Sequence, residues 1–254
     1  MKKRLFFIIV SGMLILATIK LSAQVAINND GSSSDNSAML DVKSTTKGLL
    51  PPRMTAALRN AIASPAAGLI IWCLDCGSGE LQVYNGTAWT NVTGTTPAPP
   101  LVIGNSYQGG VLAHIWGPGE PGYVAGEFHG LIIAPSDQIS SPWGCVNSVI
   151  GGTSYSLGTG QANTTLIVNG CGEAGIAAHI CDDLGLNGYS DWFLPSSSEA
   201  SITLIPGTPG LIAEFYWTSS EEDQYFARVY CPNCGGLSPL WKHYPYHVRC
   251  VRDF

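Results

Sequence analysis

The pattern of apolar and polar positions predicts two helices in the second half of the 254-residue chain, over 173–184 and 197–204. Apolar residues recur every four positions in the first helix and so share one face; they are Ile176, Ile180 and Leu184. The second helix begins with the spacing of a capping box, in which Ser196 and Glu199 each bind a backbone N–H of the other.

Short apolar runs between Gly and Pro residues predict β-strands on both sides of these helices. The runs lie at 110–116, 130–136, 215–220, 225–230 and 247–254. Strands first, helices in the middle and strands last favour an α+β domain over 103–254, with small antiparallel sheets and two helices.

Residues 24–92 predict a separate, β-rich module. Thr55 can cap a short helix, the run 68–72 is typical of a buried strand, and Asn85–Gly86 favours a type I′ hairpin turn. Thr and Pro residues crowd the segment 93–102, which we interpret as a linker. A module of this size buries little core, so we expect it to form oligomers or to pack on its neighbour. A homotrimer is our hypothesis.

Residues 1–23 have the features of a secretory signal peptide. Lys2, Lys3 and Arg4 precede an apolar run over 5–19, and small residues precede a cleavage site after residue 23. The apolar run is shorter than the roughly 20 residues that cross a bilayer as a helix, and no later run is long enough. We therefore expect an exported protein without a membrane span, at the cell surface or outside the cell, with a periplasmic location left open.

The charge of the chain excludes one class of partner. Without residues 1–23 the protein keeps eight of its 12 basic residues and all 18 acidic ones, and no Lys or Arg lies between Arg59 and Arg228. Proteins that bind nucleic acid or sulfated polysaccharide draw their affinity from clustered cations. Such partners are therefore not expected.

Eight cysteines in an exported chain predict disulfide bonds. Two pairs have the spacing C-x-x-C, namely Cys73 with Cys76 and Cys231 with Cys234. Together these pairs could instead hold zinc between four thiolates, or one pair could act in thiol redox chemistry. The other four cysteines are Cys145, Cys171, Cys181 and Cys250.

A short ring-rich segment is the strongest candidate for a binding site. Its ring-bearing residues are Trp241, His243, Tyr244, Tyr246 and His247. Aromatic rings can stack on sugar rings, while Tyr hydroxyls and His nitrogens bond hydroxyl groups. The alternative is a strand whose alternate residues fill the core. The two histidines could also bind a metal, although Pro245 prevents the helix that would align them.

A second candidate is a set of carboxylates that could surround Ca²⁺. The set comprises Asp182, Asp183, Glu221, Glu222 and Asp223, with Asp191 as a further member. The alternative is a solvated acidic face in which Asp191 caps a turn or pairs with Arg249 or Arg252. No other cofactor is expected. The chain lacks the hydrolase, metalloprotease and phosphate-loop motifs, so we predict no enzyme activity.

Several motifs resemble a known bacterial family. They are "WGC" at 143–145, "GTGQANTTLIVNGC" at 158–171, "CDDLGLNGYSDWFLPSSSEA" at 181–200, "YWTSSE" at 216–221 and "VRCVRDF" at 248–254. In this order they resemble the C-terminal domain of the Legionella collagen-like protein and, more distantly, the C-type lectin-like and formylglycine-generating-enzyme superfamily. The resemblance implies a lectin-like fold over 103–254 and a disulfide from Cys181 to Cys250. Cys145 is then left to pair with Cys171, and each C-x-x-C pair to close locally.

The first module resembles surface and tail-fibre-like proteins of Bacteroidetes, through "SAMLDVKSTTKGLLPPRMTAALRNAIASPAAGLIIW" at 37–72 and "YNGTAW" at 84–89. Together the resemblances imply an exported binding or adhesion protein that recognises an extracellular glycan or a surface protein through loops of 103–254. A structural subunit of an extracellular fibre or surface assembly is the first alternative, and a thiol-dependent oxidase is the second.

Overall fold

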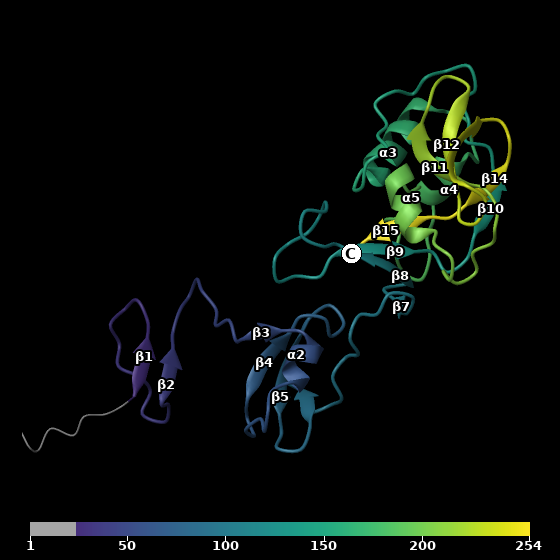
Figure 1. The fold of residues 1–254 in the computed structure, drawn as a ribbon. Coiled ribbons are helices and arrows are strands. Elements are labelled where there is room, and N and C mark those ends of the chain that lie inside the picture. Colours follow the sequence, from purple (N-terminus) through teal and green to yellow (C-terminus); the bar gives the residue numbers. More distant parts are fainter. Residues whose placement is uncertain (1–23) are drawn as a thin grey trace, which may run out of the picture. The chain divides into compact units, whose positions relative to one another are not determined.

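The computed structural model describes residues 24–254 (Figure 1). The signal peptide expected over 1–23 lies outside the described residues. The chain divides into two compact units, Met1–Pro51 and Pro52–Phe254. The finer boundaries at 92 and 102 stay predictions. Across residues 24–254, no helix has the length and apolarity that a membrane span requires.

The described part of the first unit is a ribbon of two short parallel strands, β1 (Val25–Ile27) and β2 (Leu40–Val42). The connection between them has the length that parallel strands need. Backbone bonds from Val25 N to Met39 O (2.8 Å) and from Lys43 N to Ile27 O (3.0 Å) extend the pairing at both ends. No residue between 24 and 51 is buried, so the ribbon has no core of its own.

Residues 52–102 form a four-stranded sheet in the order β3-β4-β5-β6 with one short helix. The elements are β3 (Arg53–Met54), α2 (Ala56–Asn60), β4 (Ile70–Cys73), β5 (Glu80–Tyr84) and β6 (Trp89–Asn91). Thr55 caps α2, because its side chain accepts a hydrogen bond from Leu58 N (3.3 Å). The segment interpreted as a linker contacts this module through a bond from Leu101 N to Asp75 O (2.7 Å).

Residues 103–254 contain two further sheets. The first is antiparallel in the order β15-β9-β8-β7. Its strands are β7 (Ser106–Tyr107), β8 (Gly110–Ile115), β9 (Gly130–Ile133) and β15 (Val251–Asp253). β9 is buried along its whole length, so its apolar side chains lie at the centre of the core.

The second sheet has the order β10-β14-β11-β12-β13. Its strands are β10 (Gln138–Ser141), β11 (Tyr216–Glu221), β12 (Phe226–Cys231), β13 (Gly236–Trp241) and β14 (Tyr246–Val248). β11 runs parallel to β14, and the other neighbours are antiparallel. The hairpin of β12 and β13 pairs in register from Phe226 opposite Trp241 to Cys231 opposite Gly236.

Three helices pack against the strands of this sheet (Figure 1): α3 (Gly160–Gly170), α4 (Ala177–Asp182) and α5 (Ser197–Thr203). The predicted capping box of α5 is confirmed, because Ser196 N donates to Glu199 Oε2 (2.8 Å) and Glu199 N donates to Ser196 Oγ (3.3 Å). α4 is shorter than the helix predicted over 173–184. Gly175 has a positive φ of 70° and Ile176 is extended, so the helix cannot start earlier.

The predicted α+β fold class is wrong. Strands account for 28% and helices for 13% of the described residues, in four sheets and four helices, so the protein is mostly β. The described residues show no C-type lectin-like fold. The prediction failed because pairings such as β10 with β14 join segments about 100 residues apart, which no local pattern reveals. The run 247–254, expected as one strand, divides at Arg249 and Cys250 between two sheets.

Four disulfides cross-link the protein and leave no free cysteine. They join Cys73 to Cys76, Cys145 to Cys171, Cys181 to Cys250 and Cys231 to Cys234. The third ties α4 to the segment between β14 and β15, at the centre of the core. With all sulfurs bonded, the two C-x-x-C pairs hold no thiolate for zinc.

Candidate functional surfaces

One face of the ribbon is aliphatic and exposed. Paired residues of neighbouring strands lie on the same side, and successive residues alternate. The register therefore puts four aliphatic side chains on one face, while Ala26 and Asp41 occupy the other. We call the first set the ribbon face: Val25, Ile27, Leu40 and Val42, with exposed fractions of 51%, 56%, 55% and 38%.

A surface of this kind is normally covered. Parallel sheets occur with both faces packed, and an isolated pair of short strands is barely stable in water. Met39, Leu49 and Leu50 add further exposed apolar side chains to the same unit. In a single copy these apolar side chains therefore stay exposed to solvent.

A second surface is aromatic and comes from the ring-rich segment near the end of the sequence. Trp241 and Tyr244 are 42% and 49% exposed, and the His243 ring lies between them at centroid distances of 5.7 Å and 4.0 Å. Tyr246 continues the row, 6.3 Å from Tyr244. Its ring also contacts the buried Trp217 at 5.1 Å, so the exposed rings are joined to the core.

Two rings that the sequence analysis missed extend this surface. Phe226 lies opposite Trp241 across the hairpin, with ring centroids 4.9 Å apart, and the Tyr225 ring lies 5.7 Å from Trp241. Asp223 positions both, because its Oδ1 accepts bonds from Tyr225 N (2.7 Å) and Phe226 N (2.8 Å). An acid two residues before an aromatic pair is the sequence signal for this turn. We call the whole set the aromatic surface: Tyr225, Phe226, Trp241, His243, Tyr244 and Tyr246.

A buried ion pair lies directly beneath the aromatic surface and holds the backbone that carries its rings. Lys242 is fully buried, with Nζ 2.6 Å from Glu221 Oε1 and 4.5 Å from the centroid of the Trp143 ring. The Glu221 carboxylate accepts two more bonds, from Ile150 N (2.9 Å) and Gly151 N (2.7 Å). Lys242 lies in the turn that follows β13, where Tyr244 N donates to Trp241 O (3.2 Å), so its buried ion pair holds the turn that presents Trp241, His243 and Tyr244.

His247 does not belong to the aromatic surface. Its Nδ1 lies 3.4 Å from Asp137 Oδ2, and its ring lies 5.3 Å from that of Tyr216. The Tyr216 hydroxyl also donates to Asp137 (3.0 Å), as does the buried Arg249 (2.6 Å). Burial raises the pKa of Tyr216 to about 12, with the Asp137 carboxylate acting in the same direction, so this hydroxyl keeps its proton. The cluster joins the residue before β10 to β11 and to β14, and His247 is partly exposed.

The carboxylates considered for Ca²⁺ do not converge. Glu221 and Glu222 bind basic side chains, and Asp223 caps the turn before β12. Asp182 and Asp183 lie at the end of α4. Within residues 24–254, no three of these acids come together as a metal-binding group.

Every basic side chain of residues 103–254 has an acidic partner. This region has four Lys and Arg residues against 13 Asp and Glu residues. The pairs are Arg228 with Glu222, Lys242 with Glu221, Arg249 with Asp137 and Arg252 with Asp191. The Arg252 hydrogen bonds lower the pKa of Asp191. The region therefore has no unpaired Lys or Arg for an anionic ligand.

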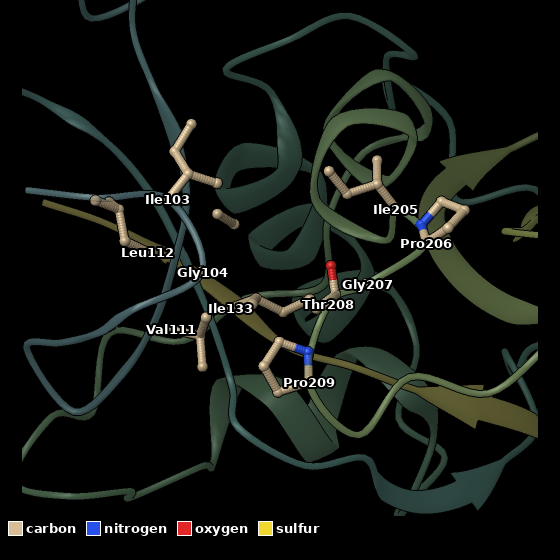
Figure 2. A pocket seen from close by; sticks show the side chains of 11 residues that line it. Ile103, Gly104, Val111, Leu112, Ile133, Ile205, Pro206, Gly207, Thr208 and Pro209 are labelled. Carbon is tan, nitrogen blue, oxygen red and sulfur yellow. The ribbon is translucent and has the colours of Figure 1, made fainter.

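An apolar hollow of about 220 Å³ lies elsewhere in this unit (Figure 2). Ile103, Val111 and Leu112 face the segment 205–209 across it. The hydroxyl of Thr208, in that segment, already donates to Thr203 O (3.1 Å). No residue that lines the hollow has a titratable side chain, so it offers no chemistry.

Comparison with known proteins concerns mainly the first part of the chain. The family described as "Phage tail like trimerisation region" matches residues 26–106, which is 81 of the 254 residues. This segment contains all of the ribbon except Val25, together with the four-stranded sheet. The match agrees with the resemblance to tail-fibre-like proteins. No curated protein sequence matches the chain. The resemblance of residues 103–254 to the Legionella collagen-like family stays a prediction.

Proposed function

We propose that this protein is a structural subunit of a fibre-like assembly, in which residues 26–106 hold three copies together and each copy displays residues 103–254. The exposed ribbon face is the observation that carries the proposal. Four aliphatic side chains on a parallel ribbon without a buried residue need a cover, and a second and third copy would supply it. The similarity of this segment to a trimerisation region supports three copies.

A matched set of ribbon variants tests this proposal. Leu40→Gln puts an amide on the ribbon face, whereas Ala26→Gln puts the same amide on the opposite face. Burying a leucine contributes roughly 1.5–3 kcal/mol per copy, so Leu40→Gln should raise the concentration needed for assembly about a hundredfold. Ala26→Gln should leave it unchanged. Sedimentation velocity over a dilution series measures both, and equal behaviour of the two variants would remove the ribbon face from the proposal.

The aromatic surface favours a second function, which is binding or adhesion to an extracellular glycan or a surface protein. Its support is the set of exposed rings at the end of β13 and in the turn that follows it, with Trp241 and Tyr244 each more than 40% exposed. Three copies in one assembly would strengthen weak single-site binding through avidity. Binding of the protein to a panel of glycans and surface proteins, compared with a Trp241→Ala variant, tests this function. Retained binding in the variant would place the ligand elsewhere.

Export and the absence of enzyme activity are part of the same proposal. Export is supported by the basic residues and the apolar run of residues 1–23. Antibody labelling of intact cells, compared with permeabilised cells, separates a surface location from a periplasmic one. Labelling only after permeabilisation would contradict the proposed surface location.

A further inference from the structure

The aromatic surface presents free polar atoms beside its rings. Among the described residues, no protein group hydrogen-bonds the side-chain polar atoms of Trp241, His243 or Tyr244. Burial raises the pKa of the neighbouring Tyr246, so its hydroxyl keeps a proton to donate. The surface thus combines apolar ring faces with N–H and O–H groups at the ring edges, a pattern that suits a ligand with C–H faces and many hydroxyls.

Charge decides between neutral and anionic ligands of this kind. Arg228 is the partly exposed cation that lies nearest in sequence to Tyr225 and Phe226, and its Nε already donates to Glu222 Oε2 at 2.5 Å. Lys242 is buried against Glu221 and cannot reach the surface. Glu222 and Asp223 lie just before Gln224 and the aromatic pair, and their negative charges oppose a sulfate or carboxylate group. An anionic ligand would therefore meet no free partner here.

The composition of the aromatic surface differs from that of the ribbon face. The ribbon face consists of Val, Ile and Leu side chains without polar atoms, which can be buried without loss of a hydrogen bond to water. The six members of the aromatic surface include three tyrosines, a tryptophan and a histidine, whose polar edges would lose their water in a dry interface. A ligand that brings its own hydroxyls replaces that water.

We propose that the aromatic surface binds an uncharged oligosaccharide, with sugar rings stacked on Trp241 and Tyr244 and hydroxyls bound by the ring-edge atoms. This inference rests on the second function proposed above. It names the ligand class and adds Tyr225 and Phe226 to the site. The sulfated and carboxylated glycans are excluded by the pairing of every Lys and Arg in residues 103–254.

Calorimetric titration of the full protein tests the inference. The probes are uncharged hexasaccharides of glucose, xylose and mannose, beside heparin and oligogalacturonate fragments. Tyr244→Ala removes an exposed ring and is the main variant, with Trp241→Ala as a second. Tyr123→Ala is the matched control, because this ring is 39% exposed and contacts none of the surface rings.

We expect binding of at least one uncharged hexasaccharide, about tenfold weaker in each surface variant and unchanged in the control. The affinity should not depend on salt, since no charge pair forms. Preference for the anionic probes, or loss of binding at high salt, overturns the ligand class while leaving the binding function. If the protein binds surface proteins but none of the oligosaccharides, the ligand class is likewise overturned and the binding function is kept. No binding to any probe or surface protein overturns the inference together with the second function, and leaves the trimeric assembly to be judged on its own test.

Discussion

The two exposed apolar surfaces of this protein differ in what lies behind them. The ribbon face belongs to a two-stranded ribbon, and no residue between 24 and 51 is buried. Behind the aromatic surface lie fully buried side chains, among them Trp143, Trp217 and Val229. Three disulfides and a buried ion pair also stabilise residues 103–254, whereas the ribbon has no cross-link.

This difference indicates what each surface is for. A surface on a unit that lacks a core of its own gains stability when further strands or other copies cover it. A surface that stands on a complete core can remain exposed and meet a ligand. We therefore propose assembly through the aliphatic face and recognition through the aromatic one.

The largest expected effect is the loss of stability when the buried ion pair behind the aromatic surface is broken, compared with the loss when a more exposed ion pair is broken. Lys242→Met leaves the Glu221 carboxylate buried without its cation, so it should lower the free energy of unfolding by about 3–5 kcal/mol. Arg228→Met breaks the more exposed pair with Glu222 and should cost less than about 1 kcal/mol. Urea unfolding measures both variants. Equal costs would mean that the Lys242 pair does not anchor the hairpin.

The stability lost on removing a disulfide should also depend on where the disulfide lies, being larger in the core than at the hairpin tip. The Cys181–Cys250 bond closes a loop over a separation of 69 residues, and its replacement by two alanines should cost about 4 kcal/mol. The Cys231–Cys234 bond spans a separation of three residues at the hairpin tip, and its replacement should cost about 2 kcal/mol or less. Thermal melting of the two double variants tests the ranking, and a reversed order would contradict it.

Dilution should act on the ribbon alone. If other copies supply its cover, the amide protons of Val25 and Lys43 should exchange faster as the protein is diluted. Amide protons in the buried strand β9 should not respond, because that core is complete within one chain. Hydrogen exchange followed by mass spectrometry at two concentrations gives both rates. A concentration-independent ribbon would count against assembly through it.

The smallest effect concerns pH. Burial raises the pKa of Glu199 above its usual 4.5, so above that pH the folded state holds its proton more firmly than the unfolded state. Stability from this group is therefore complete below pH 4.5 and is lost as the pH rises through the folded pKa. Glu199→Gln keeps a capping side chain and should flatten this slope. Burial also raises the pKa of Asp253, so some slope should remain.

Asp191 provides the control of opposite sign. Its pKa is lowered by the bonds from Arg252, so its contribution is present above pH 3.8 and is lost as the pH falls through the lower folded value. Asp191→Asn should therefore lower the free energy of unfolding near neutral pH and have little effect on it in strong acid. Unfolding curves across this pH range distinguish the two variants, and identical profiles would contradict both assignments.

Local signals in the sequence predicted the caps but not the sheets. The cap at Thr55 and the capping box at Ser196 need only neighbouring residues, and both are present. The type I′ turn at Asn85–Gly86 is wrong, since Asn85 does not have the positive φ that this turn needs. Its side chain instead accepts bonds from Thr87 N and Ala88 N (2.9 Å each) in a four-residue loop.

Contacts between distant residues explain what the sequence concealed. α3 contains Gly, Asn and Thr and lacks a strong apolar stripe, so local propensity does not predict it. It forms because Thr164 binds Leu194 N (3.0 Å) and Ile167 is buried. The aromatic surface was predicted in part, but the place of Phe226 beside Trp241 depends on strand register. The ribbon face depends in the same way on the pairing of β1 with β2.

The native mass of the wild-type assembly tests the central claim most directly. Native mass spectrometry of the purified protein at micromolar concentration should give a species with three times the mass of one chain. The ribbon face would then have the neighbours that its exposed aliphatic side chains require. A single-chain mass at that concentration, with the ribbon amides equally protected from exchange, would contradict the account.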